Sequence, residues 1–200
     1  MDKLASGTVV VTESVFQRVQ VVGSNCQMTV EKSRFDMFND GSIGVQGGFA
    51  RIENNLIVNA VELDDSMYVT GVAPGSTVRF NTFVNTSGIA SDGTALACDG
   101  TPAVTSNIFA YNSRHPLSPA DTCAARYSLF DATTSSEEAV GAGNHTADAA
   151  AFFVDRLRKD FHLGPDSPAR GKAEPGLGVV DDIEGHRRPV AADVGAYQGH

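Results

Sequence analysis

Val78-Arg-Phe-Asn81-Thr-Phe83 decides the fold of this chain, because the same pattern returns 26 positions later as Val104-Thr-Ser-Asn107-Ile-Phe109. Both stretches hold an aliphatic residue, two variable positions, Asn, one variable position and Phe. With Ala allowed at the first position, Ser at the Asn position and Ile at the Phe position, the pattern occurs six times. Its anchors, which are 19, 22, 26, 26 and 21 positions apart, are Ser14, Ser33, Asn55, Asn81, Asn107 and Ser128.

This irregular spacing is typical of a solenoid whose coils share a strand register while their loops differ in length. We expect a coil of about 22 residues. Stacked coils bring equivalent residues to about 4.8 Å from one another, so Asn55, Asn81 and Asn107 are predicted to form a ladder of buried amides. The sequence therefore predicts an all-β parallel β-helix of about six coils, one for each anchor.

A second, weaker series of strands precedes three of the motifs, at Ile43-Gly-Val45-Gln46, Met67-Tyr-Val69-Thr70 and Ala95-Leu-Ala97-Cys98. Turn-forming residues such as Ser91-Asp-Gly-Thr94 introduce two of these strands. Two or three strands per coil that all run the same way make a parallel solenoid, and the handedness of parallel crossovers predicts a right-handed one. An antiparallel sandwich explains short strands, but not the return of one pattern at the same place in each period.

Composition and charge exclude several classes of partner. The chain has 200 residues, 42% of them hydrophobic and 20% charged, which suits one globular domain. The net charge of −9 argues against nucleic acid, and no run approaches the ~20 apolar residues of a membrane helix. Met1-Asp-Lys-Leu-Ala-Ser-Gly7 lacks the features of a signal peptide. The chain therefore either stays inside the cell or is a mature or truncated chain, and the strand-like run that begins directly at Thr8 favours truncation.

The three cysteines allow two interpretations. Cys98 and Cys123 are 25 positions apart, close to one coil, and would bridge neighbouring coils while Cys26 stays free. Alternatively, all three are buried small apolar residues.

The repeat stops after Phe130, and the rest of the chain carries a different signature. Residues 132–142 are predicted to form a surface loop, and residues 148–159 a short helix or an irregular cap. Three motifs follow: Asp160-Phe-His-Leu163-Gly-Pro-Asp-Ser167-Pro168-Ala169, Asp182-Ile-Glu-Gly185-His-Arg187-Arg188-Pro189 and Asp193-Val-Gly195-Ala196-Tyr197. We expect residues 1–147 to form the coils and residues 148–200 to form a closing segment of the same domain.

Together with the coils, these motifs resemble the C-terminal part of bacterial β-helix proteins of the pectate-lyase-like superfamily, in particular surface proteins described as choice-of-anchor Q domain proteins. The resemblance covers about residues 50–198. It implies a right-handed parallel β-helix and an extracellular or cell-surface location. It also implies that the C-terminal pattern is a structural closure, in which Asp193 and Arg187 organise a turn.

Members of that superfamily often bind or cleave acidic polysaccharides, and the lyases use Ca²⁺ and a basic residue that abstracts a proton. Arg79, Arg114 and His115 are candidates for the base. Arg51, Arg79 and Arg126 form either a basic stripe for an anionic polymer or cross-coil ion pairs with Glu31 and Glu53. Candidate calcium ligands in the loops are Glu62, Asp64, Asp65, Asp92 and Asp99. Acidic residues in such loops are more often part of ordinary turns.

The sequence contains no complete catalytic set, and the spacing of its five histidines does not indicate a zinc site. Three hypotheses follow. The first is a surface β-helix that binds carbohydrate or a protein partner along one face. The second is a calcium-dependent uronate lyase. The third is an assembly module that associates with another chain through an uncapped N-terminal coil.

Overall fold

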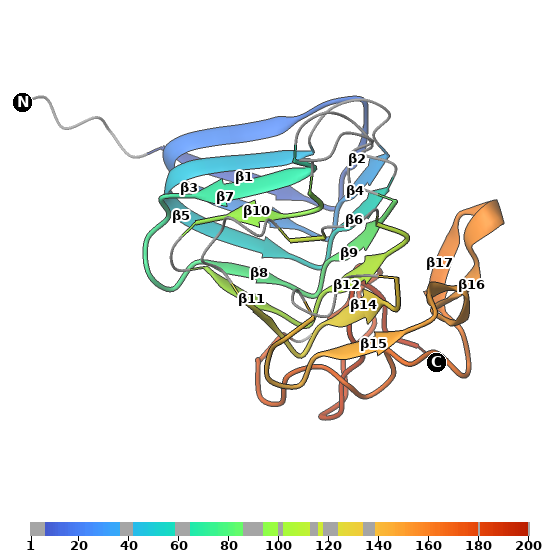
Figure 1. The fold of residues 1–200 in the computed structure, drawn as a ribbon. Coiled ribbons are helices and arrows are strands. Elements are labelled where there is room, and N and C mark those ends of the chain that lie inside the picture. Colours follow the sequence, from blue (N-terminus) through green and yellow to red (C-terminus); the bar gives the residue numbers. More distant parts are fainter. Residues whose placement is uncertain are drawn as a thin grey trace, which may run out of the picture.

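The computed structural model describes residues 7–36, 42–58, 65–85, 94–99, 102–112, 116–117, 124–133, 139–179 and 181–199, and all that follows concerns these residues. They form a parallel β-solenoid, which confirms the predicted fold class (Figure 1). One sheet, sheet A, follows the order β1 (Thr8–Thr12), β3 (Val21–Glu31), β5 (Ile43–Glu53), β8 (Thr77–Arg79), β11 (Ala103–Thr105) and β13 (Ala125–Arg126). Two further strands of sheet A, β7 (Met67–Thr70) and β10 (Ala97–Cys98), extend it beside the first half of β5.

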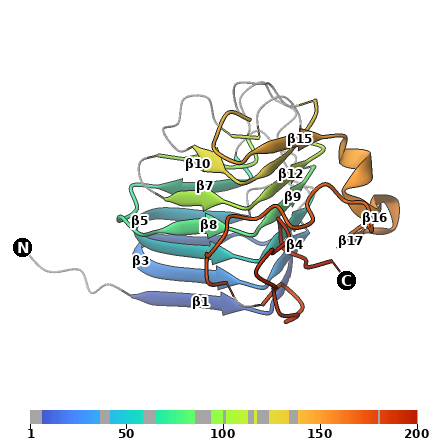
Figure 2. The ribbon, with the colours of Figure 1, turned by 90° about the horizontal axis from the view of Figure 1, so that it is seen from below.

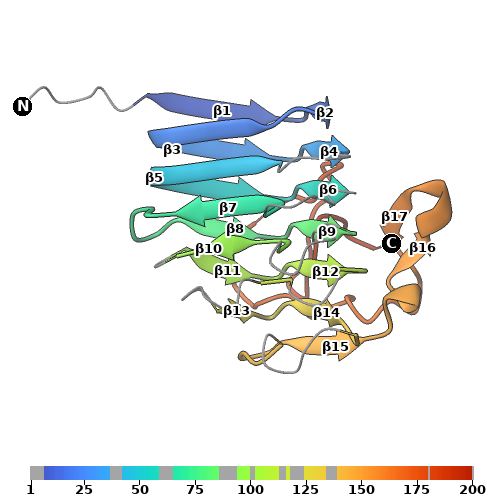
Figure 3. The same cartoon turned by 45° about the horizontal axis from the view of Figure 1, so that its top comes forward.

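The other large sheet, sheet B, holds the second strand of each motif. Its order is β2 (Val15–Gln17), β4 (Arg34–Asp36), β6 (Leu56–Val58), β9 (Thr82–Val84), β12 (Ile108–Ala110), β14 (Leu129–Asp131) and β15 (His145–Ala147). Figure 3 shows these strands stacked in rungs from β2 to β15. The remaining elements are the antiparallel pair β16 (Phe153–Asp155) and β17 (Asp160–Leu163), and the short 3₁₀ helices η1 (Ala149–Ala151) and η2 (Arg156–Arg158).

The predicted register is present in both sheets. In sheet A the aliphatic positions stack from Val11 to Ala125, and in sheet B the aromatic or Ile positions stack from Phe16 to Phe130. Neighbouring Phe rings lie parallel, with centroids 4.8 to 5.0 Å apart. These side chains fill the interior of the solenoid, so burial of the two periodic positions holds each coil in line with the next.

A bend between the two sheets occurs at the same place in every coil. The residue before each anchor takes a left-handed conformation, with φ between 46° and 57°. Its N–H then donates to a carbonyl of the next coil, as from Phe80 to Thr105 at 3.3 Å. The bend turns the aliphatic position and the Phe position of one motif toward the same interior. The residues concerned are Glu13, Lys32, Asn54, Phe80, Ser106 and Tyr127.

The solenoid makes about four turns, fewer than the six predicted. Each anchor marks one corner between sheets A and B.

The C-terminal segment lies along the side of the solenoid, next to the outer face of sheet B (Figure 2). Leu56, Val84 and Ile108 point away from the interior and pack with Val194 and Ala196 in a second hydrophobic cluster. The division at residue 147 into coils and closing segment stays a prediction.

Two of the three cysteines lie within the described residues. Cys98 is disulfide-bonded and Cys26 is free and buried, while Cys123 lies outside the described residues. Among the described residues, no helix has the length and apolar character needed to cross a membrane.

Candidate functional site

The structure brings Asn55, Asn81 and Asn107 together in a continuous ladder inside the solenoid. All three side chains are fully buried. The Asn81 Oδ1 accepts hydrogen bonds from the backbone N and the Nδ2 of Asn55, both at 3.0 Å. The Asn81 Nδ2 donates to the carbonyl of Ile52 at 2.9 Å and to the Asn107 Oδ1 at 3.1 Å. The amides therefore satisfy one another and the backbone at each bend.

The ladder continues one coil beyond the six predicted anchors, at Asn144. The backbone N of Ser128 donates to the Asn144 Oδ1 at 2.9 Å, and the Asn144 Nδ2 donates to the carbonyl of Ala125 at 2.9 Å. Gly143, the preceding residue, has a positive φ of 71°, as at the other bends. The signal that sequence reasoning missed is an Asn after a Gly 16 positions from Ser128. These asparagines have a structural role.

The outward arginines of sheet A belong to cross-coil ion pairs. Arg51 lies 2.9 Å from Glu31 and 3.1 Å from Glu53. Arg79 lies 2.5 Å from the same Glu53, whose side chain is only 2% exposed and also accepts from the Thr77 hydroxyl. Of the two interpretations of this stripe, cross-coil ion pairing describes the contacts, so the positive charge is already balanced here.

The C-terminal segment supplies partners for two of the outward arginines of sheet A, Arg126 and Arg79. Arg126 lies 2.9 Å from Glu174, whose carboxylate also accepts from the Thr105 hydroxyl at 2.7 Å. Arg79, a candidate base, donates a further hydrogen bond to the carbonyl of Leu177 at 3.0 Å. Its guanidinium is therefore engaged by one carboxylate and one carbonyl.

The candidate calcium ligands that are described do not converge. Asp65 accepts from the backbone N and the hydroxyl of Thr94, at 3.1 and 2.7 Å, and Asp99 accepts from the backbone N of Gly71. Each carboxylate thus links two coils, and neither appears in the one described group of side chains that is spaced for a metal ion. The other candidate ligands, Glu62, Asp64 and Asp92, and the candidate bases Arg114 and His115 lie outside the described residues.

A neutral polar surface lies on the outer face of the first half of sheet A. Tyr68 pairs with Gly44 of the next strand, and a Cβ atom on Gly44 would overlap the tyrosine ring. The ring therefore lies over the glycine. One row along, Ser24, Gln46 and Thr70 stand side by side on the same face and are exposed or half-buried. The surface combines an aromatic ring with uncharged hydrogen-bonding groups.

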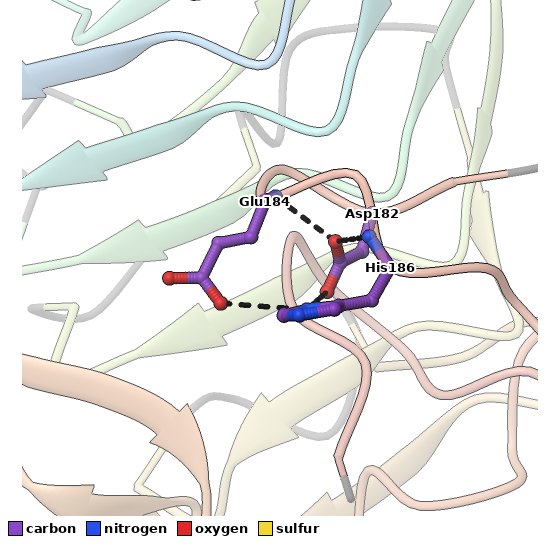
Figure 4. A group of neighbouring side chains, drawn as sticks. All are labelled: Asp182, Glu184 and His186. Atoms are coloured by element: carbon purple, nitrogen blue, oxygen red, sulfur yellow. Dashed lines mark hydrogen bonds and ion pairs between the residues drawn. The ribbon is translucent and has the colours of Figure 1, made fainter.

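A tight turn at Asp182–His186 gathers two carboxylates and an imidazole in the C-terminal segment (Figure 4). Asp182 is fully buried, and its Oδ1 accepts from the backbone N atoms of Glu184 and His186, at 2.9 and 2.8 Å. Its Oδ2 accepts from the backbone N of Gln198 at 2.9 Å. Gly185 has a φ of 84°, which permits the turn. The buried aspartate thus fixes the backbone from which Glu184 and His186 project.

His162 of β17 joins this turn through Glu184. The His162 Nε2 lies 3.1 Å from the Glu184 Oε2, and the His162 Nδ1 lies 2.6 Å from Asp160. Burial lowers the pKa of His162, but its hydrogen bonds to the two carboxylates outweigh this, so the pKa lies above its ordinary value. The hydrogen bond with His162 in turn lowers the pKa of Asp160. Burial raises the pKa of the adjacent Tyr197 to about 12.

The predicted pairing of Asp193 with Arg187 is wrong, because Arg188 takes that place. Arg188 is buried, donates to the backbone carbonyls of Asp193 and Gly195, and reaches Asn54 of the solenoid at 2.8 Å. Its guanidinium lies 4.2 Å from the centroid of the Phe80 ring, and burial lowers its pKa to about 10. Arg187 is exposed. Arg188 instead faces the solenoid and holds the C-terminal segment against it.

No family model and no curated protein matches the sequence.

Proposed function

We propose that this chain is a bacterial surface β-helix module that binds uncharged carbohydrate on the outer face of sheet A. The observation that carries the proposal is the ring of Tyr68, which lies over Gly44 beside the row of Ser24, Gln46 and Thr70. A flat ring suits the apolar face of a sugar, while amide and hydroxyl groups exchange hydrogen bonds with its hydroxyls. The surface location rests on the resemblance of the C-terminal motifs.

The charge distribution favours an uncharged ligand over a uronate polymer. Arg51, Arg79 and Arg126 are each held by a glutamate, and the whole chain carries a net charge of −9. An anionic polymer would have to displace existing ion pairs and would be repelled at long range. The uronate lyase, which needs Ca²⁺ and a base, is therefore the less favoured activity.

The test is electrophoresis of the protein through gels that contain a soluble neutral polysaccharide, such as galactomannan or mixed-linkage glucan, or polygalacturonate. We expect retardation by a neutral polymer and none by polygalacturonate. Tyr68→Ala should abolish the retardation, whereas Tyr68→Phe, which keeps the ring, should bind nearly as the wild type does. Wild-type mobility that no neutral polymer changes, or full retardation of Tyr68→Ala, would refute the proposal. Formation of an unsaturated uronate product would favour the lyase.

A second candidate function is self-association through the first coil, with a second copy of this chain as the partner. Strands β1 and β2 are terminal in their sheets, and Val10 and Val15 are 63% and 69% exposed. Thr8–Thr12 is uncharged and β-branched throughout, and such an edge pairs readily with another strand. Sedimentation should then show a dimer that Val10→Lys dissociates, and a wild-type monomer at all concentrations would exclude this function.

A further inference from the structure

We propose that Asp182, Glu184 and His186, together with His162, form a binding site for a divalent transition-metal ion of the Zn²⁺ type. The site lies in the C-terminal segment and does not depend on the proposed sugar-binding face. Two imidazoles and two carboxylates are ligands that Zn²⁺ takes in proteins, whereas Ca²⁺ prefers oxygen ligands alone.

The donor atoms of Asp182, Glu184 and His186 are spaced for one ion, and His162 reaches this group of three through Glu184. With metal–ligand bonds of about 2.0–2.2 Å, neighbouring donors of a tetrahedral site lie about 3.4 Å apart. The Glu184 Oε2 lies 3.1 Å from the His162 Nε2 and 3.5 Å from the His186 Nδ1. The His186 Nδ1 lies 3.6 Å from the Asp182 Oδ2. The donor atoms of Asp182, Glu184 and His186 all lie within 4.8 Å of one another.

Two of the four ligands are held in place by further hydrogen bonds. Asp182 uses three acceptor positions on backbone N–H groups, and a carboxylate has about four. The remaining one belongs to Oδ2, the oxygen nearest His186. Asp160 holds the Nδ1 of His162 and leaves its Nε2 toward Glu184, the arrangement in which a carboxylate orients a metal-binding histidine.

The bound ion would join two parts of the C-terminal segment. His162 lies in β17, and Glu184 lies 22 positions later in the turn. The ring of Tyr197 lies beside His162, with centroids 4.6 Å apart. A metal that bridges β17 and the turn would therefore stabilise the segment along the side of the solenoid.

The experiment is calorimetric titration of the whole chain with Zn²⁺, after treatment with a chelator, and with Ca²⁺ as the comparison. We expect one equivalent of Zn²⁺ to bind and Ca²⁺ to bind much more weakly. At a hundredfold excess of Zn²⁺ over its Kd, the Tm should rise by about 5–10 °C. Co²⁺ should give the visible absorption of a four-coordinate ion with nitrogen ligands. Absence of Zn²⁺ binding, or equal affinity for Ca²⁺, overturns the inference.

Variants assign the binding to these residues. His186→Ala and Glu184→Gln should each weaken Zn²⁺ binding more than tenfold, and Asp160→Asn, which leaves all four ligands in place, by about tenfold. His145→Ala is the matched control, because His145 is an exposed histidine of β15 outside the group, and its affinity should equal that of the wild type. Circular dichroism and the Tm without metal show whether each variant is folded. Folded variants that keep wild-type affinity overturn the inference.

Discussion

Replacing Asn81 by Leu tests whether hydrogen bonding in the ladder, and not the volume of the side chain, holds the coils together. Leu has the same branched skeleton of side-chain heavy atoms and is apolar, but it can neither donate nor accept. The substitution removes the acceptor of the Asn55 N–H and the donors to the Ile52 carbonyl and the Asn107 Oδ1. The Asn55 Nδ2 keeps its bond to the carbonyl of Val30.

The expected loss follows from these contacts. An unsatisfied buried donor costs about 1–3 kcal/mol, and each further hydrogen bond about 0.5–1.5 kcal/mol. Asn81→Leu should therefore lower the free energy of unfolding by about 3–5 kcal/mol. Asn81→Ser should cost less, about 1–2 kcal/mol, because Ser128 shows that a hydroxyl at an anchor accepts the same backbone N–H, from Asn107 at 3.1 Å.

The assay is equilibrium unfolding in urea, followed by circular dichroism because the chain has no Trp. Ser14→Ala is the matched control at the exposed end of the ladder. Its hydroxyl donates only to the exposed carbonyl of Thr12, and the change should cost under about 0.5 kcal/mol. The volume explanation makes the smaller Ser more damaging than Leu at position 81. A Leu variant as stable as the Ser variant, or within about 1 kcal/mol of wild type, would refute the hydrogen-bond reasoning.

Three further predictions concern charge, pH and backbone conformation. Glu53→Ala should lower the free energy of unfolding by about 2–4 kcal/mol, because it leaves the largely buried Arg79 without its carboxylate. Glu31→Ala, which removes a partner of the more exposed Arg51, should lower it by under about 1 kcal/mol. Unfolding in urea measures both changes. In the presence of a chelator, the stabilisation from protonated His162 should be complete below about pH 6.5 and be lost as the pH rises through the raised pKa of the folded state. The Tm measured against pH should decline over that range. A Tm without this decline would show that His162 is not held by the two carboxylates. Gly195→Ala should lower the free energy of unfolding by more than about 2 kcal/mol, since its Cβ would lie 2.6 Å from two side-chain atoms. Gly185→Ala meets no atom and should cost only about 1–2 kcal/mol of backbone strain. Equal rates of proteolysis of the C-terminal segment in the two variants would contradict this difference.

The solenoid was predictable because its stabilising contacts repeat. One aliphatic position, one anchor and one aromatic position are buried in each coil, so the register can be read without a structure. Asn144 was not predicted as an anchor because it belongs to the last coil. The positions that should be apolar are Gly141 and Thr146, and β15 is largely exposed on this side. Where no further coil covers the strand, burial no longer selects apolar residues, and the pattern fades although the amide contact persists.

The C-terminal segment could not be placed in the same way, because its contacts do not repeat. Arg187 and Arg188 are adjacent and chemically identical, and only the approach of Asn54, far away in the sequence, decides which one is buried. The same holds for the metal-site candidates. His162 and His186 have no informative spacing, and each lies near Glu184, whose side chain reaches from the turn toward β17. The local signal was Asp182-Ile-Glu184-Gly-His186, three ligand types on alternate residues, which a search for pairs of histidines does not detect. Since these residues are brought together by the path of the segment and not by a period, a substitution that releases the segment, such as Gly195→Ala, should weaken Zn²⁺ binding without touching any ligand.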